Sequence, residues 1–161
     1  MHPDPEAAMD LRDLAHGEHL VVWTFRAFAA GRRDCPLMAR EYRGACGEWA
    51  AQARAAMEVF AQQLQLQGRR TVELGRPGVL TLTRDEQLLL AIFTAAQRGA
   101  IDRCQAHLTW LLARPAPALF HAAASVVARA LAASGHHMGV ARAPEPQELE
   151  VAPRDLIGAY A

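Results

Sequence analysis

The chain has 161 residues, and its 17 arginines balance 17 acidic residues, so the formal net charge is zero. It contains no lysine, which excludes a P-loop in its usual form and any lysine Schiff-base chemistry. A chain of this length buries enough surface to fold as one domain without disulfides or a metal. Abundant alanine, and arginine without lysine, are typical of a GC-rich genome, so we expect a bacterial protein.

The zero net charge conceals an uneven distribution. Residues 1–18 carry a net charge of −4 and residues 144–161 carry −3, whereas residues 19–143 carry +7. Acidic residues are common at helix starts and in solvated tails, and this alone could explain the pattern. Alternatively, the basic body binds anions and the acidic ends compete for it.

Cysteine usage and hydrophobicity favour a cytoplasmic protein. Cys35, Cys46 and Cys104 are an odd number of cysteines with wide spacing, which fits a reducing compartment. The first ten residues are acidic and lack the basic start and apolar run of a secretory signal. The most apolar stretch, residues 115–135, contains Arg129 and other polar residues, so we expect no membrane span.

The first helical pattern covers about residues 5–30. Its apolar positions recur at helical spacing on one face, and Gly17 could loosen it. The sequence from Gly31 to Asp34 then indicates a helix end and a turn.

A second helical pattern runs over residues 36–66. Its apolar positions form a narrow seam that comprises Met38, Tyr42, Cys46, Trp49, Ala53, Met57, Phe60 and Leu64. A straight helix of this length would be longer than the domain is wide, and Gly44 and Gly47 weaken it near its middle. Either the helix bends or breaks near residues 44–47, or its far end projects and packs against another chain. We favour one bent helix, and the seam could also support self-association into a homodimer.

Residues 71–82 change character. Two alternating runs flank a Pro77-Gly78 turn, which predicts a short β-hairpin packed against the helices. Thr83 and Glu86 follow with the spacing of a capping box, in which each side chain bonds the other residue's backbone amide. We therefore expect a helix to begin directly after the hairpin.

The rest of the chain completes the predicted fold. Two more helices are expected over residues 101–114 and about 118–134, which together with the others form a single domain over residues 1–139. Residues 140–161 are rich in Pro, Glu and Ala, which predicts a mostly disordered acidic tail. The predicted class is all-α, with five or six helices and one hairpin at about residues 71–82.

Cys35 is the candidate nucleophile. Pro36 suits the first position of a helix, so Cys35 is expected at the N-cap, where its thiol would face free backbone amides. Arg32 and Arg33 precede it, and a positive environment raises the reactivity of a thiol. Alternatively, Asp34 is the cap and Cys35 fills a small buried space.

The chain lacks the residue patterns of common metal and hydrolase sites. It has no Cys-x-x-Cys, no His-Glu-x-x-His and no Glu-x-x-His, and neither serine lies in a Gly-x-Ser-x-Gly motif. Four histidines could meet at one end of a helical bundle, although nothing in the sequence requires it: His16, His19, His136 and His137. We expect a non-catalytic protein without a metal or another cofactor.

Two groups of aromatic and basic residues predict protein–protein binding, because Trp and Arg are favoured at binding hot spots. One group shares the face of residues 101–114 opposite the leucines and comprises Arg103, His107, Trp110 and Arg114. The other lies on the first helix, away from its main apolar face, and comprises His16, His19 and Trp23. Alternatively, each Trp packs in a second layer of the core.

Arginines outside the apolar faces form a candidate anion-binding surface, which comprises Arg32, Arg33, Arg40 and Arg43. The alternative is a solvated face without a ligand. Taken together, the sequence favours a small protein that acts by binding another protein. Two other functions stay open, a regulatory protein that binds nucleic acid through its arginines and a thiol-dependent redox protein that uses Cys35.

Overall fold

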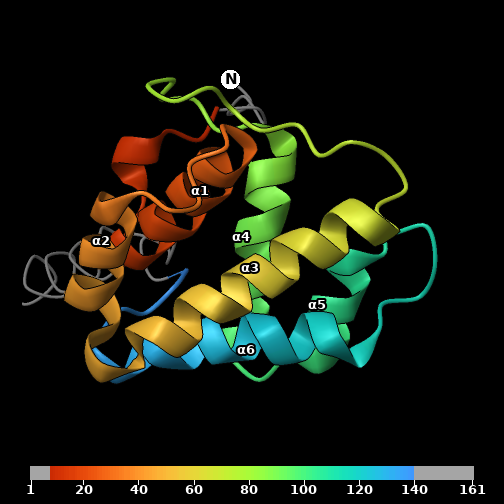
Figure 1. The fold of residues 1–161 in the computed structure, drawn as a ribbon. Coiled ribbons are helices and arrows are strands. Elements are labelled where there is room, and N and C mark those ends of the chain that lie inside the picture. The colour runs from red at the N-terminus through yellow and green to blue at the C-terminus, as the bar shows by residue number, and fades with distance from the viewer. Residues whose placement is uncertain (1–7, 140–161) are drawn as a thin grey trace, which may run out of the picture.

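A computed structural model describes residues 8–139 and shows a mainly helical fold, as the sequence predicts (Figure 1). In chain order, the elements are η1 (Leu11–Asp13), α1 (His16–Ala29), α2 (Pro36–Cys46), η2 (Gly47–Trp49), α3 (Ala50–Gln67), α4 (Arg84–Gln97), α5 (Ile101–Leu108) and α6 (Ala118–Ala133), where η marks a 3-10 helix. Within the described residues, none of these helices combines the length and the hydrophobicity that a membrane span requires. The predicted tail at residues 140–161 lies outside the described residues.

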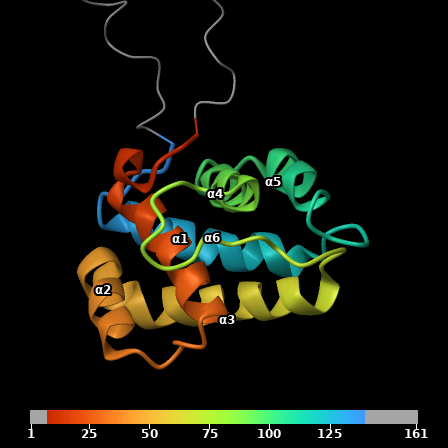
Figure 2. The same ribbon diagram turned by 90° about the horizontal axis from the view of Figure 1, so that it is seen from above.

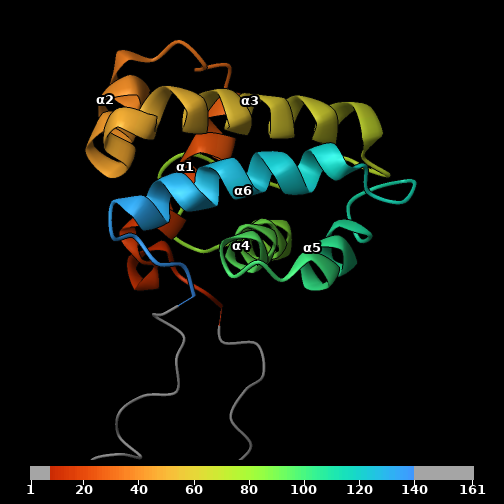
Figure 3. The same ribbon diagram turned by 90° about the horizontal axis from the view of Figure 1, so that it is seen from below.

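The helix α6 lies at the centre of the molecule. Figures 2 and 3 show α3 on one side of it and α4 with α5 on the other. Its buried positions are mostly small, since Ala123, Ala124, Ala128 and Ala130 alternate with larger apolar residues. Small side chains let neighbouring helices approach closely, so an alanine-rich helix suits this position between two layers.

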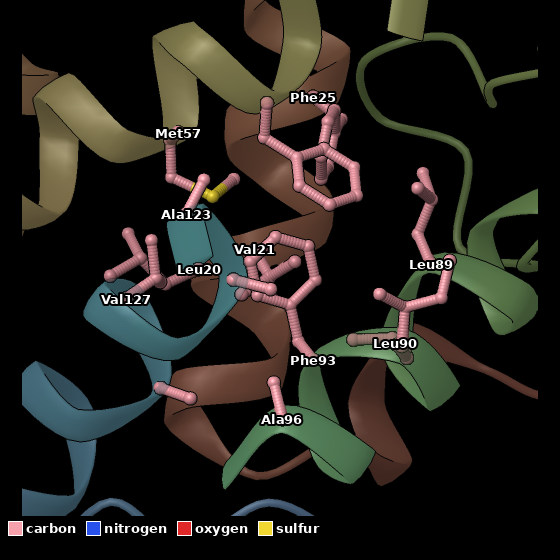
Figure 4. Close-up of a cluster of buried hydrophobic side chains, with 14 of the residues drawn as sticks. Leu20, Val21, Phe25, Met57, Leu89, Leu90, Phe93, Ala96, Ala123 and Val127 are labelled. Atoms are coloured by element: carbon pink, nitrogen blue, oxygen red, sulfur yellow. The ribbon is translucent and has the colours of Figure 1, made fainter. Parts of the chain in front are cut away.

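Four phenylalanines join the layers in the core. Phe25 of α1, Phe60 of α3, Phe93 of α4 and Phe120 of α6 lie with neighbouring ring centroids 5.0–6.0 Å apart, several edge to face. Such pairs contribute beyond the area that they bury. Figure 4 shows part of this core, where Phe25 and Phe93 meet Met57, Leu89 and Leu90.

The predicted bent helix over residues 36–66 is instead two helices, α2 and α3. The break lies where the glycines predict it, because Gly47 has a φ of +55°, a value that ends α2 and that other residues rarely adopt. The seam is buried inside the chain, with the exception of Trp49, which is 46% exposed. The other seam side chains already pack against the protein's own core, and self-association of the chain stays a prediction.

The first helix is also shorter than expected. Leu14 and Ala15 have extended backbone, and α1 begins only at His16, where the carboxylate of Glu18 accepts the Ala15 amide at 3.2 Å. Gly17 therefore lies in the first turn of α1 and does not loosen its middle. The preceding residues form η1, whose start Asp10 caps through the Arg12 amide.

The predicted hairpin at residues 71–82 does not form. The backbone amides of Glu73 and Gly75 donate to the carboxylates of Asp85 and Glu86, at 2.7 and 2.8 Å, and not to a facing strand. On the other half of the segment, the Val79 and Thr81 carbonyls accept from the side chain of Arg26. Side chains thus take several of the groups that a hairpin would need, while Leu80 and Leu82 bond the backbone of Leu11 and Met9, so the segment is an irregular loop.

The predicted capping box of α4 is confirmed. The Glu86 amide donates to the Thr83 hydroxyl at 3.0 Å, and the Thr83 amide donates to the Glu86 carboxylate at 2.9 Å. Glu86 also accepts from Gly75 and Arg26, so the residue that starts the helix also holds the preceding loop.

Candidate functional site

A groove runs along the face of α1 that carries His16, His19 and Trp23. Two adjoining cavities of about 320 and 220 Å³ share His19, Trp23 and Leu37 in their linings, so they form one continuous depression, here called the α1 groove. Its floor is one face of α1, from His16 to Ala27. Its two walls are the start of α2, with Leu37, and the loop that follows α3, with Pro77 and Leu80. The ribbon in Figure 1 shows where these two elements lie relative to α1.

The wall formed by α2 follows from local sequence. Gly31 turns the chain with a φ of +76°, and Pro36 begins α2 with Cys35 at the N-cap, as predicted. This start leaves Leu37 half exposed at the groove. Deeper in the structure, the hydroxyls of Thr24 and Tyr42 lie 2.7 Å apart and join α1 to α2 through a buried hydrogen bond.

The opposite wall is loop 77–80, which a buried ion pair holds in place. The guanidinium of Arg26 donates to both oxygens of Glu86, at 2.6 and 2.9 Å, and both side chains are almost fully buried. The same guanidinium donates to the Val79 carbonyl at 2.6 Å. Any Cβ at residue 75 would collide with it, which explains the glycine at that position.

The environment of Glu86 keeps this carboxyl ionised. Burial by itself raises the pKa, but the ion pair with Arg26 and the amides of Thr83 and Gly75 outweigh it, so the pKa of Glu86 lies below its usual value. A second bidentate pair, Arg70 with Asp85 at 2.6 and 2.8 Å, lies at the start of the loop. This pair lowers the pKa of Asp85, mainly through the hydrogen bonds from Arg70.

The fold brings several predicted site residues together in the α1 groove. Arg32 and Cys35 from the turn before α2 line it with His19 and Trp23 of α1. Cys35 is partly buried, and its thiol makes no hydrogen bond with another residue of 8–139. Activation of a nucleophile by a base requires such a bond, so the geometry shows no thiol–imidazole pair.

The other predicted arginines lie elsewhere. Arg33 stacks over the Phe28 ring, with 5.5 Å between its guanidinium carbon and the ring centroid, and lines a separate cavity. Arg40 and Arg43 are exposed on α2. None of the four predicted arginines forms an ion pair with another residue of 8–139, and this includes Arg32.

The predicted binding face on residues 101–114 is not one helical face. The helix α5 ends at Leu108, so Trp110 lies in the turn that follows and Arg114 in a bend beyond Leu112, while Arg103 and His107 remain on the helix. The chain leaves the helix because Leu112 pairs with Gly68 in an antiparallel bridge. Trp110 is nevertheless 65% exposed, so its packing in a second core layer is excluded.

Two of the four histidines meet at one end of the fold. The rings of His16 and His136 have centroids 5.1 Å apart. Burial, followed by the neighbouring His16 and His137, lowers the pKa of His136, and burial followed by His16 and Arg26 lowers the pKa of His19. Among the described residues, no group of three His, Cys, Asp or Glu side chains could hold a metal ion.

Sequence reasoning missed the loop wall of the groove and the residue that holds it. The available signal was Arg26, a single charge within the apolar run from Leu20 to Phe28. Such a residue on a buried face needs a partner, but the sequence does not indicate that the partner lies 60 residues away.

Comparison of the chain with known protein families, with curated proteins and with solved structures finds no match.

Proposed function

We propose that the protein is a non-catalytic binding module that holds an amphipathic helix of another protein in the α1 groove. The observation that carries this proposal is the apolar groove itself, whose rim keeps Leu37 and Leu80 50% and 44% exposed. Large apolar side chains gathered around a depression are typical of a surface that binds a partner.

The dimensions of the groove fit a helix of about three turns. Its floor runs from His16 to Ala27, and twelve residues of helix extend about 18 Å. A helix that binds in a groove inserts apolar anchors spaced by three, four and seven residues. Trp23 lies midway along this floor and lines both cavities, so it would meet the central anchor.

Charges beside the groove favour a partner with acidic flanks. Arg32 lines the groove, and Arg40 and Arg43 lie on the same helix as its α2 wall. Glu41 is the acidic residue among the lining side chains of the described groove. An excess of positive charge near an apolar groove speeds the encounter with an acidic segment and selects against basic ones.

A protein partner explains the groove better than a nucleic acid does. Affinity for nucleic acid comes mainly from cations that contact phosphates, to which an apolar depression contributes nothing. Because exposed arginines are present, nucleic-acid binding is the alternative outcome of the test. It would be recognised by an affinity for nucleic acid that falls steeply as the salt concentration rises.

The test uses display selection with a library of helical peptides that carry apolar anchors on one face and Glu on the flanks. Selected peptides should bind the full chain, and Leu37→Glu combined with Leu80→Glu should weaken binding at least about tenfold, since two anchors would face unpaired charges. Val126→Glu is the matched control, because Val126 is a 41% exposed apolar residue on α6, remote from the groove.

Three results would overturn the proposal. The selection could yield no binder, the Leu37→Glu and Leu80→Glu variant could bind as tightly as the unaltered chain, or Val126→Glu could weaken binding equally. If Trp110→Ala abolishes binding and the groove variant does not, the partner surface lies after α5 instead.

A further inference from the structure

A second, larger cavity lies on the other side of α1. It has a volume of about 580 Å³, opens to solvent and is lined by the end of α1, the second half of α3 and residues 68–74. Volumes of this order are typical of small-molecule sites. It shares no lining residue with the α1 groove, so the two sites can be tested separately.

The lining of this cavity combines apolar side chains with polar ones, the latter including Gln65 and Thr71. Phe25 and Phe28 line it from α1, Leu64 from α3, and Val72 and Leu74 from the loop. Val72 and Leu74 are only partly buried in the fold, although they pack against the core. They therefore leave apolar surface that a ligand can remove from water.

One unneutralised cation lies at this cavity. Arg33 lines it, is exposed, and forms no ion pair with another residue of 8–139, while its stacking on Phe28 directs the guanidinium toward the apolar surface. Arg70 also lines it, but both of its terminal nitrogens donate to Asp85. Among the described residues, no acidic side chain lines this cavity. Its charge therefore favours a bound anion.

The loop wall of the cavity is held in place before any ligand arrives. The Arg69 amide donates to the Leu111 carbonyl at 2.9 Å, and the Glu73 amide donates to Asp85 at 2.7 Å. These bonds fix both ends of the segment that lies over the cavity. A preformed site does not have to order its own backbone when the ligand binds, which favours affinity.

We propose that this cavity binds an amphipathic anion, a molecule with an alkyl chain and a terminal carboxylate. The chain would lie against the partly exposed side chains of Val72 and Leu74, and the carboxylate would pair with the guanidinium of Arg33. A guanidinium binds a carboxylate through two parallel hydrogen bonds, which gives this headgroup an advantage over a neutral one.

The test compares decanoate with decanol, which have the same chain length and differ in headgroup charge, by calorimetric titration of the full chain. Decanoate should bind at least about tenfold more tightly than decanol, and Arg33→Gln should remove this difference without changing the affinity for decanol. Arg40→Gln, an exposed arginine outside the cavity, is the matched control and should leave both affinities unchanged.

A second variant tests the place of binding. Ala61 lines the cavity from α3 and is partly buried, so Ala61→Phe should fill the space and weaken both ligands, with helical content checked by circular dichroism. Equal binding of decanoate and decanol, an unchanged decanoate affinity in Arg33→Gln, or no binding at millimolar ligand would each overturn the proposal. If Ala61→Phe lowers helical content, Arg33→Gln decides alone, because its side chain is exposed.

Discussion

A single guanidinium determines the path of the loop over α1. Arg26 bonds the carboxylate of Glu86 and the carbonyls of Val79 and Thr81, and it does so from a position that is 4% exposed. The end of the loop pairs with residues 9–11 through an antiparallel bridge between Thr81 and Asp10, and residues 76–79 depend on the Arg26 side chain. The binding wall at Leu80 is thus tied to an ion pair in the interior.

The first prediction concerns this ion pair. Arg26→Met should lower the free energy of unfolding by about 3–5 kcal/mol, because it leaves the buried Glu86 without its cation. Arg12→Met should cost far less, since the Arg12 side chain is 73% exposed in its pair with Asp10. Urea unfolding followed by circular dichroism gives both values.

Combining Arg26→Met with Glu86→Gln separates charge from packing. The double variant should recover part of the loss, because Gln removes the uncompensated charge but still accepts hydrogen bonds. Hydrogen exchange at residues 76–81 should accelerate in both variants. Slow exchange there in Arg26→Met would contradict the view that this side chain holds the loop.

At the scale of elements, the break between α2 and α3 decides where the groove wall begins. A single helix over residues 36–66 would carry α2 away from α1, whereas Gly47 lets α2 fold back beside it. Two glycines near this break have different roles. Gly44 lies inside α2 with open space around it, and Gly47 has a φ of +55°.

The second prediction is that alanine has opposite effects at these two glycines. Gly44→Ala should stabilise the protein by about 0.5–1 kcal/mol, because alanine is the better helix former and meets no neighbour. Gly47→Ala should destabilise it by about 1–3 kcal/mol, because residues with a Cβ rarely adopt a φ of +55° with a ψ of −127°. Thermal unfolding of the two variants checks the signs, and a shift in the same direction for both would refute this explanation of the break.

At the scale of the whole molecule, the two ends of the described chain meet. Gln97 of α4 donates to the carbonyl of His136 at 3.0 Å and accepts the amide of Met138 at 2.7 Å, which fixes the turn after α6. This turn places His136 against His16 at the start of α1. Burial, and then the neighbouring His16, keep the pKa of His136 below its usual value, so this junction responds to pH.

The third prediction follows from the lowered pKa values of His19 and His136. Because the folded state holds these groups neutral, the unfolded chain takes up protons first as the pH falls through about 6.5. The free energy of unfolding should therefore decrease between about pH 7.5 and 5.5. A second loss should follow below about pH 4.5, where the carboxylates of Asp85 and Glu86, with lowered pKa values, become protonated.

Histidine variants distinguish this explanation from a general effect of acid. His136→Gln should flatten the stability profile between about pH 7.5 and 5.5, and adding His19→Gln should flatten it further. The loss of stability below about pH 4.5 should stay unchanged in both variants. A profile that keeps its full slope without the two imidazoles would show that other groups titrate.

Local features made much of this fold predictable. The capping box of Thr83 and Glu86, Pro36 at the start of α2 and the glycines near residue 47 act within a few residues, so their pattern is visible in the chain. The candidate site was only partly predictable. His19, Trp23, Arg32 and Cys35 were singled out separately, but the sequence did not indicate that they line one groove.

The sequence by itself determined the helical class, the starts of α2 and α4 and the place of the break at Gly47, because periodicity, capping and backbone preference are local. Only the tertiary structure decided that residues 71–82 form a loop and not a hairpin, and that this loop closes a groove over α1. The physical reason is distance along the chain. Arg26 and Glu86 lie 60 residues apart, and their buried ion pair takes several of the hydrogen-bonding groups that a hairpin would have used.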